Sequence, residues 1–338
     1  MHKIQTDTAN GFKILHVQYD SPISLILFLV KNGARNETKE KAGISHFIEH
    51  MMFKQTEKRS TMQIAMEIET LGGQTNAFTT YEATGYYIKV LEENFDKSFE
   101  ILSDMFQNGK FTEKDLEIER GNIIEEINMY EDSPSDIVWN YVHSNIYHGN
   151  PLERPIIGYK KTLEKMKRED LLQFLQTNYL QDDCLIVSVG KFDIERTKQN
   201  IQNNLNPRKS GKLSIEKAKF EPKEKINFHN KNEVNQTHLV MSFPGVETSS
   251  PEIYQYSILE EILGGGMGSL LFSEIREKLG IAYYVGASHY DYEDTGSFHI
   301  YFGANLDKTP MGVEKVFEIL KKVKEKGISD HDLVRAKN

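Results

Sequence analysis

The sequence carries two copies of one unit, and this repeat restricts the possible folds more than any other feature. The clearest correspondence joins "KSFEILSDMFQNGKFTEKDLEIERGN" to "KVFEILKKVKEKGISDHDLVRAKN", where Phe317 follows Phe99 by 218 positions. Both segments then open a helix with Thr112 or Ser329 and an acid three residues later, the spacing of an N-terminal capping box. Similarity at a fixed spacing predicts two supersecondary units of one kind.

Within the first copy, extended and helical segments alternate. Apolar and β-branched runs at 12–19 and 24–34 predict strands, and residues 44–54 and 61–71 show helical periodicity. Residues 73–91 predict two strands joined by a turn. We therefore expect an α+β protein of two homologous α/β sandwich domains, each formed by a sheet and its helices.

A stretch rich in lysine, proline and polar residues separates the copies and is typical of a linker. We predict an N-terminal domain at 1–206, a linker at 207–225 and a C-terminal domain at 226–338. Asn338 corresponds to Asn122, yet the first copy continues for roughly 80 more residues. The second copy is thus expected to be incomplete, with the chain truncated inside a helix; a copy that is short by nature is the alternative.

Composition argues against several classes of protein. The net charge of -9 leaves no basic surplus for binding nucleic acid. The longest apolar run, residues 23–30, has the length of a buried strand and falls far short of a membrane span. The N-terminus lacks the pattern of a secretory signal, so we expect a cytoplasmic protein. The single cysteine, Cys184, lies in an apolar strand and is interpreted as a structural thiol.

The segment "GISHFIEHMMF" places two imidazoles and a carboxylate on one side of a predicted helix. His46 and His50 are four residues apart, so their side chains lie one above the other, and Glu49 borders the same face. Two neutral imidazoles beside a carboxylate suit a divalent metal that activates water. A chance match with two structural histidines is the alternative, and an isolated residue such as His143 is more often a buried core histidine.

A metal site of this kind needs a third protein ligand, often a carboxylate. The helix predicted within "DLEIERGNIIEEINMYEDSPSD" offers several acids, of which Glu119 and Glu126 share a face two turns apart. Such acids usually form a solvated stripe. Here the surrounding isoleucines indicate burial, which favours pairing or metal binding for at least one carboxylate. These arguments do not distinguish Glu126 from Glu125.

"HFIEH", with a glutamate 76 residues beyond the second histidine in "ERGNIIEEI", resembles the inverted-motif zinc peptidases of the pitrilysin and mitochondrial processing peptidase type. The resemblance covers essentially the whole chain, including its repeat. It implies one Zn²⁺ per chain held by His46, His50 and Glu126, with Glu49 as general base. It also implies that Glu119 orients a ligand.

The segment "GGQTNAFTT" looks like the edge strand on which this family binds its substrate. The resemblance implies that Asn76, Ala77 and Phe78 pair with an extended peptide through main-chain hydrogen bonds, a mode that tolerates many sequences. The alternative is that Asn76 only stabilises a turn before the strand.

The second copy has no histidine pair where the first has one. Its "REKLGIAYYV" resembles the family's arginine and tyrosine motif, which implies that Arg276 and Tyr283 stabilise the oxyanion when the two halves close as a clamshell. Alternatively, Arg276 pairs with Glu274 or Glu277, and Tyr283 is a core residue of a strand. The nearby glycine run lacks the lysine and spacing of a phosphate-binding loop.

The predicted function is that of a zinc metalloendopeptidase acting on peptides or unfolded segments. The main alternative is a non-catalytic peptide-binding subunit that supports an active partner, and a scaffold with structural histidines is a further one. A homodimer or a heterodimer with a related subunit is compatible with the family resemblance.

Overall fold

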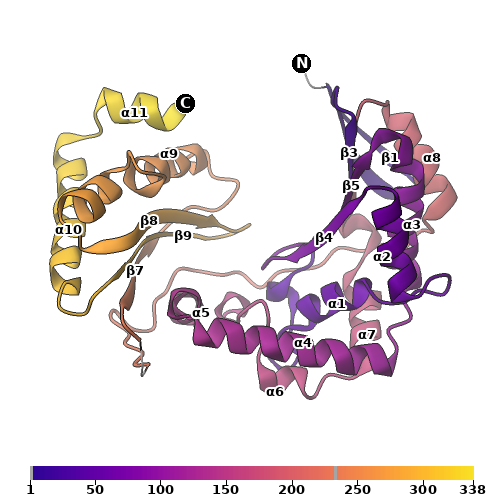
Figure 1. Ribbon diagram of the computed structural model, residues 1–338, viewed down its shortest axis with the longest axis horizontal. Helices are drawn as coiled ribbons and strands as arrows, with labels where there is room; N and C mark the ends of the chain where they lie inside the picture. Colours follow the sequence, from indigo (N-terminus) through magenta and orange to yellow (C-terminus); the bar gives the residue numbers. More distant parts are fainter. Residues whose placement is uncertain (1–2, 232–233) are drawn as a thin grey trace. The chain divides into compact units, whose positions relative to one another are not determined.

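The computed structural model describes residues 3–231 and 234–338. It divides into two compact units, Met1–Asn128 with Arg154–Glu216, and Met129–Glu153 with Lys217–Asn338 (Figure 1). The predicted domain boundaries, with domains at 1–206 and 226–338 and a linker at 207–225, differ from those of the two units and stay a prediction. The segment Met129–Glu153, which the predicted boundaries assign to the first domain, packs within the second unit.

Within the described residues, the first unit contains a six-stranded sheet. Its order is β1(Lys3–Ala9), β2(Phe12–Gln18), β6(Cys184–Gly190), β3(Ile23–Val30), β5(Thr84–Leu91), β4(Gln74–Thr79). Neighbouring strands are antiparallel except β2 and β6, which are parallel. The sequence predicted all of these strands but β1, whose polar residues give only a weak alternation.

Helices cover one face of this sheet. α3(Phe95–Asn108) packs against β3 and β5, and α8(Ile194–Asn204) packs against β1 and β2. Phe28 of β3 is fully buried, with its ring centroid 5.3 Å from that of Phe99 and 5.4 Å from that of Phe106. Alternate β3 residues on the opposite face are only partly buried, as expected for a sheet with helices on one side.

The remaining helices of this half include α1(Ile44–Met52) and α4(Glu113–Asp132), which carry the candidate site. The others are α2(Thr61–Thr70), α6(Lys160–Leu163) and α7(Arg168–Asn178). The predicted cap before α4 is present, because the Asp115 amide donates to the Thr112 hydroxyl at 3.2 Å and that hydroxyl donates to the Asp115 carboxylate at 2.6 Å.

The second unit repeats part of the first. Its described residues include a three-stranded antiparallel sheet in the order β7(Thr237–Pro244), β9(Gly296–Ala304), β8(Ala282–Asp291), which matches the order β3, β5, β4. α9(Ile253–Gly264) and the π-helix η6(Phe272–Lys278) precede β8, and α10(Thr309–Lys326) and α11(Asp330–Lys337) follow β9. The same element order in both halves agrees with the repeat seen in the sequence.

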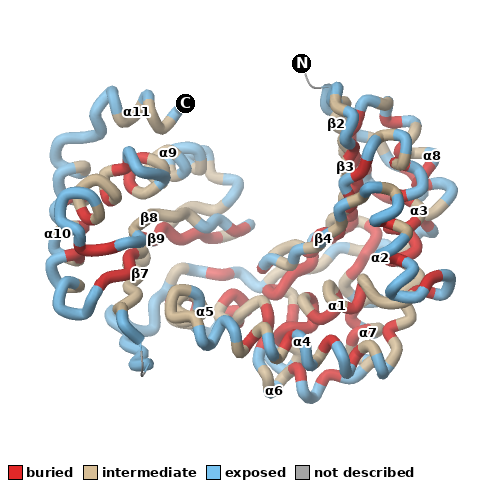
Figure 2. The backbone as a smooth tube through the Cα atoms, viewed as in Figure 1, coloured by how far each residue is buried: buried red, intermediate tan, exposed pale blue. Residues whose placement is uncertain are grey.

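β9 is buried along nearly its whole length (Figure 2), because both of its faces are covered. One face carries Phe298, Ile300 and Phe302 in the apolar core. On the other face lies α5(Pro134–Ile146), whose Trp139 ring is 5.5 Å from that of His299. A helix contributed from the middle of the chain thus completes the second unit.

No helix in the described part of the chain is both long and apolar enough to cross a membrane. Cys184 is buried at the start of β6, as expected for a structural thiol, and burial raises its pKa to about 11.

Candidate metal centre

The helix α1 carries the histidine pair, and its first turn is fixed by a buried carboxylate. Glu37 accepts hydrogen bonds from the backbone amides of Gly43, at 2.7 Å, and Ser45, at 2.8 Å. Burial raises the pKa of Glu37 to about 7. Gly43 has φ of +95°, and a Cβ there would lie 2.6 Å from the Ile157 carbonyl oxygen, so only glycine fits this entry to the helix.

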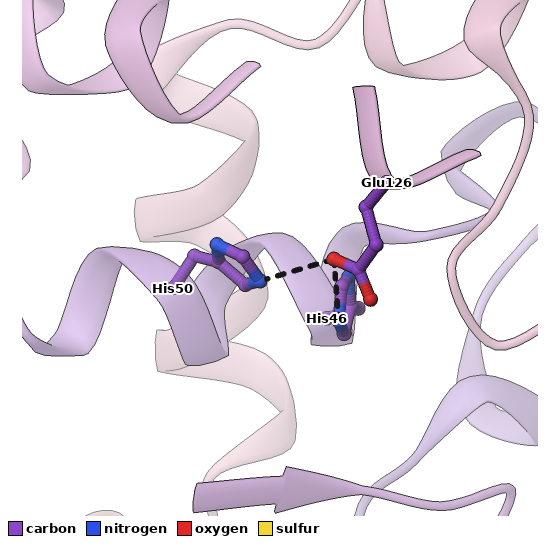
Figure 3. A group of neighbouring side chains, drawn as sticks. All are labelled: His46, His50 and Glu126. Carbon is purple, nitrogen blue, oxygen red and sulfur yellow. Dashed lines mark ion pairs between the residues drawn. The ribbon is translucent and has the colours of Figure 1, made fainter. Parts of the chain in front are cut away.

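His46, His50 and Glu126 bring three possible metal ligands together (Figure 3). One ligand atom from each lies within 4.8 Å of the others. The Glu126 carboxylate oxygen is 3.8 Å from His46 Nε2 and 3.6 Å from His50 Nε2. These separations exceed a hydrogen bond and approach the roughly 3.4 Å between ligands that tetrahedral bonds of about 2.1 Å to zinc would give.

The two imidazoles differ in their surroundings. His46 Nδ1 is buried and finds no hydrogen-bond partner in the described chain, and burial lowers the pKa of His46 to about 4, which keeps the ring neutral. Burial also acts to lower the pKa of His50, but the hydrogen bond to Glu119 and the nearby Glu126 carboxylate outweigh it and raise that pKa to about 9. Without metal, the His50 ring is therefore expected to be protonated near neutral pH, with Glu119 at its Nδ1 and Glu126 near its Nε2.

Glu119 contacts the Nδ1 atom of His50, the ring nitrogen that does not face Glu126. It is 3% exposed, and its Oε2 lies 3.0 Å from His50 Nδ1. Its other oxygen receives Lys54 Nζ at 2.5 Å and Asn122 Nδ2 at 3.0 Å. Burial raises the pKa of Glu119, but the hydrogen bonds from His50 and Lys54 prevail and hold it below its usual range. Both carboxylate oxygens are thus fixed, and the ring of His50 is oriented.

Lys54 and Asn122 were not identified from the sequence, although spacing offered a signal for Asn122. Asn122 follows Glu119 by three positions on α4, so it lies one turn from the carboxylate that it supports, whereas Lys54 reaches Glu119 from beyond the end of α1. The sequence also left Glu125 open as a ligand. The group of possible metal ligands contains Glu126 and not Glu125.

Glu49 is partly buried beside the three ligands. The hydroxyl of Thr79, at the end of β4, donates to Glu49 Oε2 at 2.5 Å. Burial raises the pKa of Glu49, and the Thr79 hydrogen bond opposes this rise. A carboxylate with a pKa moved towards neutrality, next to a group of possible metal ligands, is suited to general base catalysis.

The predicted substrate residues lie on β4, the edge strand of the sheet. Asn76 is within the strand and not in a preceding turn, and its side-chain oxygen accepts the Ala77 amide at 2.9 Å. Phe78 is 37% exposed, and its ring covers Gly85 of the neighbouring strand. The edge is therefore available to a further strand, provided that one displaces the Asn76 side chain.

Arg276 and Tyr283 belong to the second unit. The guanidinium of Arg276 lies over the ring of Tyr283, 4.5 Å from its centroid, and its Nε is 3.9 Å from the Glu277 carboxylate. Glu274 pairs instead with Lys278 at 2.6 Å. Tyr283 is 60% exposed, so it is not a core residue of its strand. The partly buried Arg276 and the exposed Tyr283 form one cation–π pair.

Comparison with known proteins agrees with this geometry. Residues 14–160 match the family described as insulinase (peptidase family M16), and residues 165–338 match the peptidase M16 inactive domain. The chain is 36% identical to an uncharacterized zinc protease of Rickettsia felis, over 97% of this chain and 79% of that protein. It is 37% identical to an uncharacterized zinc protease of Bacillus subtilis, over 91% and 75% respectively.

More distant similarities extend the comparison. A probable mitochondrial-processing peptidase subunit beta of Arabidopsis thaliana is 29% identical over 90% of this chain and 60% of that protein. The crystal structure of a protease from Helicobacter pylori superposes with a TM-score of 0.92 at 22% identity, over 100% of this chain and 84% of that one, which establishes the shared fold. The chain belongs to the peptidase M16 family, the insulinase and pitrilysin group, and is related to zinc proteases and mitochondrial processing peptidase.

Proposed function

We propose that this protein is a zinc-dependent endopeptidase that hydrolyses peptides or unfolded segments. The observation that supports the proposal is the convergence of His46, His50 and Glu126 from two helices, with Glu49 beside them. Two imidazoles and one carboxylate are a usual ligand set of catalytic zinc and leave a coordination position open.

The roles of the protein groups follow from their contacts. Zinc, when bound, supplies Lewis-acid chemistry that lowers the pKa of water and polarises a carbonyl. Glu49 accepts the proton of the attacking water and later gives it to the leaving amine, as the C–O bond forms and the C–N bond breaks. Glu119, held by Lys54 and Asn122, keeps the His50 ring oriented.

We place the substrate along β4. An extended peptide that adds to this edge binds chiefly through main-chain hydrogen bonds from Asn76, Ala77 and Phe78, so many sequences are accepted. This mode favours peptides and unfolded segments, because a folded protein does not offer a free strand.

The second unit is proposed to complete the active site. Arg276 and Tyr283 would donate hydrogen bonds to the developing oxyanion when the two halves close as a clamshell. Their exposure on the second unit is compatible with this role. A homodimer, or a heterodimer with a related subunit, is the proposed assembly, and the cytoplasmic location stays a prediction.

The test combines metal analysis with a peptide assay. We expect elemental analysis to find one zinc per chain, and a quenched-fluorescence peptide to be cleaved until a chelator removes the metal. Zinc binding without cleavage of any unstructured peptide would favour a non-catalytic peptide-binding subunit. Absence of bound zinc after incubation with the ion would refute the proposal.

A further inference from the structure

We infer that Thr79 is a positioning residue for the Glu49 carboxylate and connects it to the edge strand β4. The inference rests on the proposed function, because it assigns a role to Thr79 in the same reaction. It concerns a residue outside the predicted site, whose only sign in the sequence is its place as the penultimate residue of "GGQTNAFTT".

The contact between the two side chains is direct and selective. The Thr79 hydroxyl donates to Glu49 Oε2 at 2.5 Å, and it is the only hydrogen-bond donor that the described residues give to this carboxylate. The other oxygen, Oε1, therefore has no hydrogen bond within the described chain and can accept a proton. A glutamate side chain has three rotatable bonds, so one strong charge-assisted hydrogen bond removes much of its freedom.

The alternation of β4 explains why Thr79 reaches the helix. Thr75, Ala77 and Thr79 are partly buried, whereas the intervening residues Gln74, Asn76 and Phe78 are exposed. Ala77 packs against the apolar core, and α1 contacts β4, so this partly buried face of the strand is the one next to Glu49. The hydroxyl therefore points towards the helix and not towards solvent.

The backbone on either side of Thr79 is well defined. Thr79 pairs with Thr84 of β5, and the next residue closes a tight turn through the Thr80 amide, which donates to the Ala83 carbonyl at 2.8 Å. Among the described residues, no strand pairs with the other side of β4. A peptide added there restrains the backbone that holds the Thr79 hydroxyl, so binding of substrate also steadies the base.

The test compares two substitutions at Thr79 with a matched control on the same strand face. Thr79→Val keeps the shape and removes the donor, whereas Thr79→Ser keeps the donor. Thr75→Val removes a hydroxyl that donates to the Tyr87 carbonyl at 3.0 Å, with no contact to Glu49. Turnover of a quenched-fluorescence peptide, zinc content and thermal unfolding are measured for each full-length protein.

For Thr79→Val we expect kcat to fall roughly 10- to 100-fold, as for loss of a hydrogen bond to a charged group, with KM changed less than about twofold. Thr79→Ser recovers most of the turnover, and Thr75→Val matches the wild type. Zinc content stays at the wild-type value in all three variants. In the Glu49→Gln background, fluorescence anisotropy should give the same peptide affinity with and without the Thr79→Val substitution.

Other results would overturn the inference. Wild-type turnover in Thr79→Val shows that Glu49 needs no such support. Loss of zinc, or a drop in peptide affinity that accounts for the lost turnover, shows that Thr79 acts on the metal site or on substrate. In these cases the proposed function still stands, whereas a wild-type protein that never cleaves peptide refutes both.

Discussion

α1 with α4 in the first unit and α9 with α11 in the second occupy the same place in the element order, yet they use their polar residues differently. On α1, His46, Glu49 and His50 converge with Glu126 of α4 around a possible metal position. On α9, the two glutamates serve packing contacts. Glu260 accepts the backbone amide of His289 at 3.0 Å, and Glu261 lies 3.5 Å from Arg335 of α11.

This difference separates the fold from its chemistry. Both units maintain the order of strands and helices, so the repeat alone does not require a metal site. Among the described residues, the candidate metal ligands form a single group, which lies in the first unit. In the first copy, α1 and α4 bring possible ligand atoms together. In the second copy, an ion pair between Glu261 of α9 and Arg335 of α11 joins the corresponding helices.

The histidines of the two units also differ in their surroundings. His50 lies between two carboxylates, whereas His143 of α5 and His299 of β9 are buried among aromatic rings. His143 Nδ1 donates to the Trp139 carbonyl at 3.1 Å, and its Nε2 accepts from the Tyr292 hydroxyl at 2.9 Å, so this ring is held neutral. Isolated buried histidines serve as core residues, as expected from the sequence.

The largest difference between α1 and α9 is expected in the effect of a glutamate substitution on turnover. Glu49→Gln should lower kcat about 10²- to 10⁴-fold while zinc stays bound, because it removes the base and no ligand. Glu260→Gln on α9 is the control and should leave peptide cleavage unchanged. If the Glu49→Gln protein still cleaved peptide at the wild-type rate, Glu49 would not be the general base and would not differ in role from Glu260.

The second-largest difference between the two units is expected in zinc affinity. His50→Ala removes a proposed ligand, so zinc affinity measured by competition with a chelating dye should fall more than about 100-fold. His289→Ala in the second unit should bind zinc as the wild type does. Equal affinity of the His50→Ala protein would place the metal elsewhere.

The pH response should sharpen the comparison of histidines in the metal-free protein. Burial lowers the pKa of His143 to about 4 from its ordinary 6.5, so the unfolded chain takes up its proton first as pH falls. The contribution of His143 to the free energy of unfolding is therefore fully present above pH 6.5. It decreases towards pH 4 by on the order of 3 kcal/mol.

Imidazole NMR of chelator-treated protein measures these states directly. At pH 5.5 the His143 ring should be neutral, and at pH 8 the His50 ring should still be protonated, because Glu119 and Glu126 raise its pKa to about 9. Denaturant unfolding at both pH values reports the sum of two opposite contributions, because the raised pKa of His50 adds stability at the lower pH and the lowered pKa of His143 removes it. Titration of both rings near 6.5 would contradict the contrast.

The helix caps should show the smallest difference, since both units build them alike. The Ser329 hydroxyl accepts the Asp332 amide at 3.1 Å, as Thr112 accepts that of Asp115 at 3.2 Å. Thr112→Ala and Ser329→Ala should each lower the free energy of unfolding by about 1 kcal/mol, measured with denaturant. A much larger loss for Thr112→Ala alone would show that this cap also supports the metal helix.

The sequence by itself determined the features that depend on local pattern or fixed spacing. These are the repeat, most strands and helices, the caps, and the presence of His46, Glu49 and His50 on one helical face. Such features are set by neighbouring residues through hydrogen bonding and side-chain periodicity, so they can be recognised without knowing the fold.

Only the tertiary structure decided which distant groups meet. It placed Glu126 and not Glu125 beside the imidazoles, brought Lys54, Asn122 and Thr79 to the polar groups, and packed α5 against β9. Adjacent carboxylates on a helix point about 100° apart, and their partners come from other elements, so their roles depend on how those elements pack. Local sequence does not contain that information.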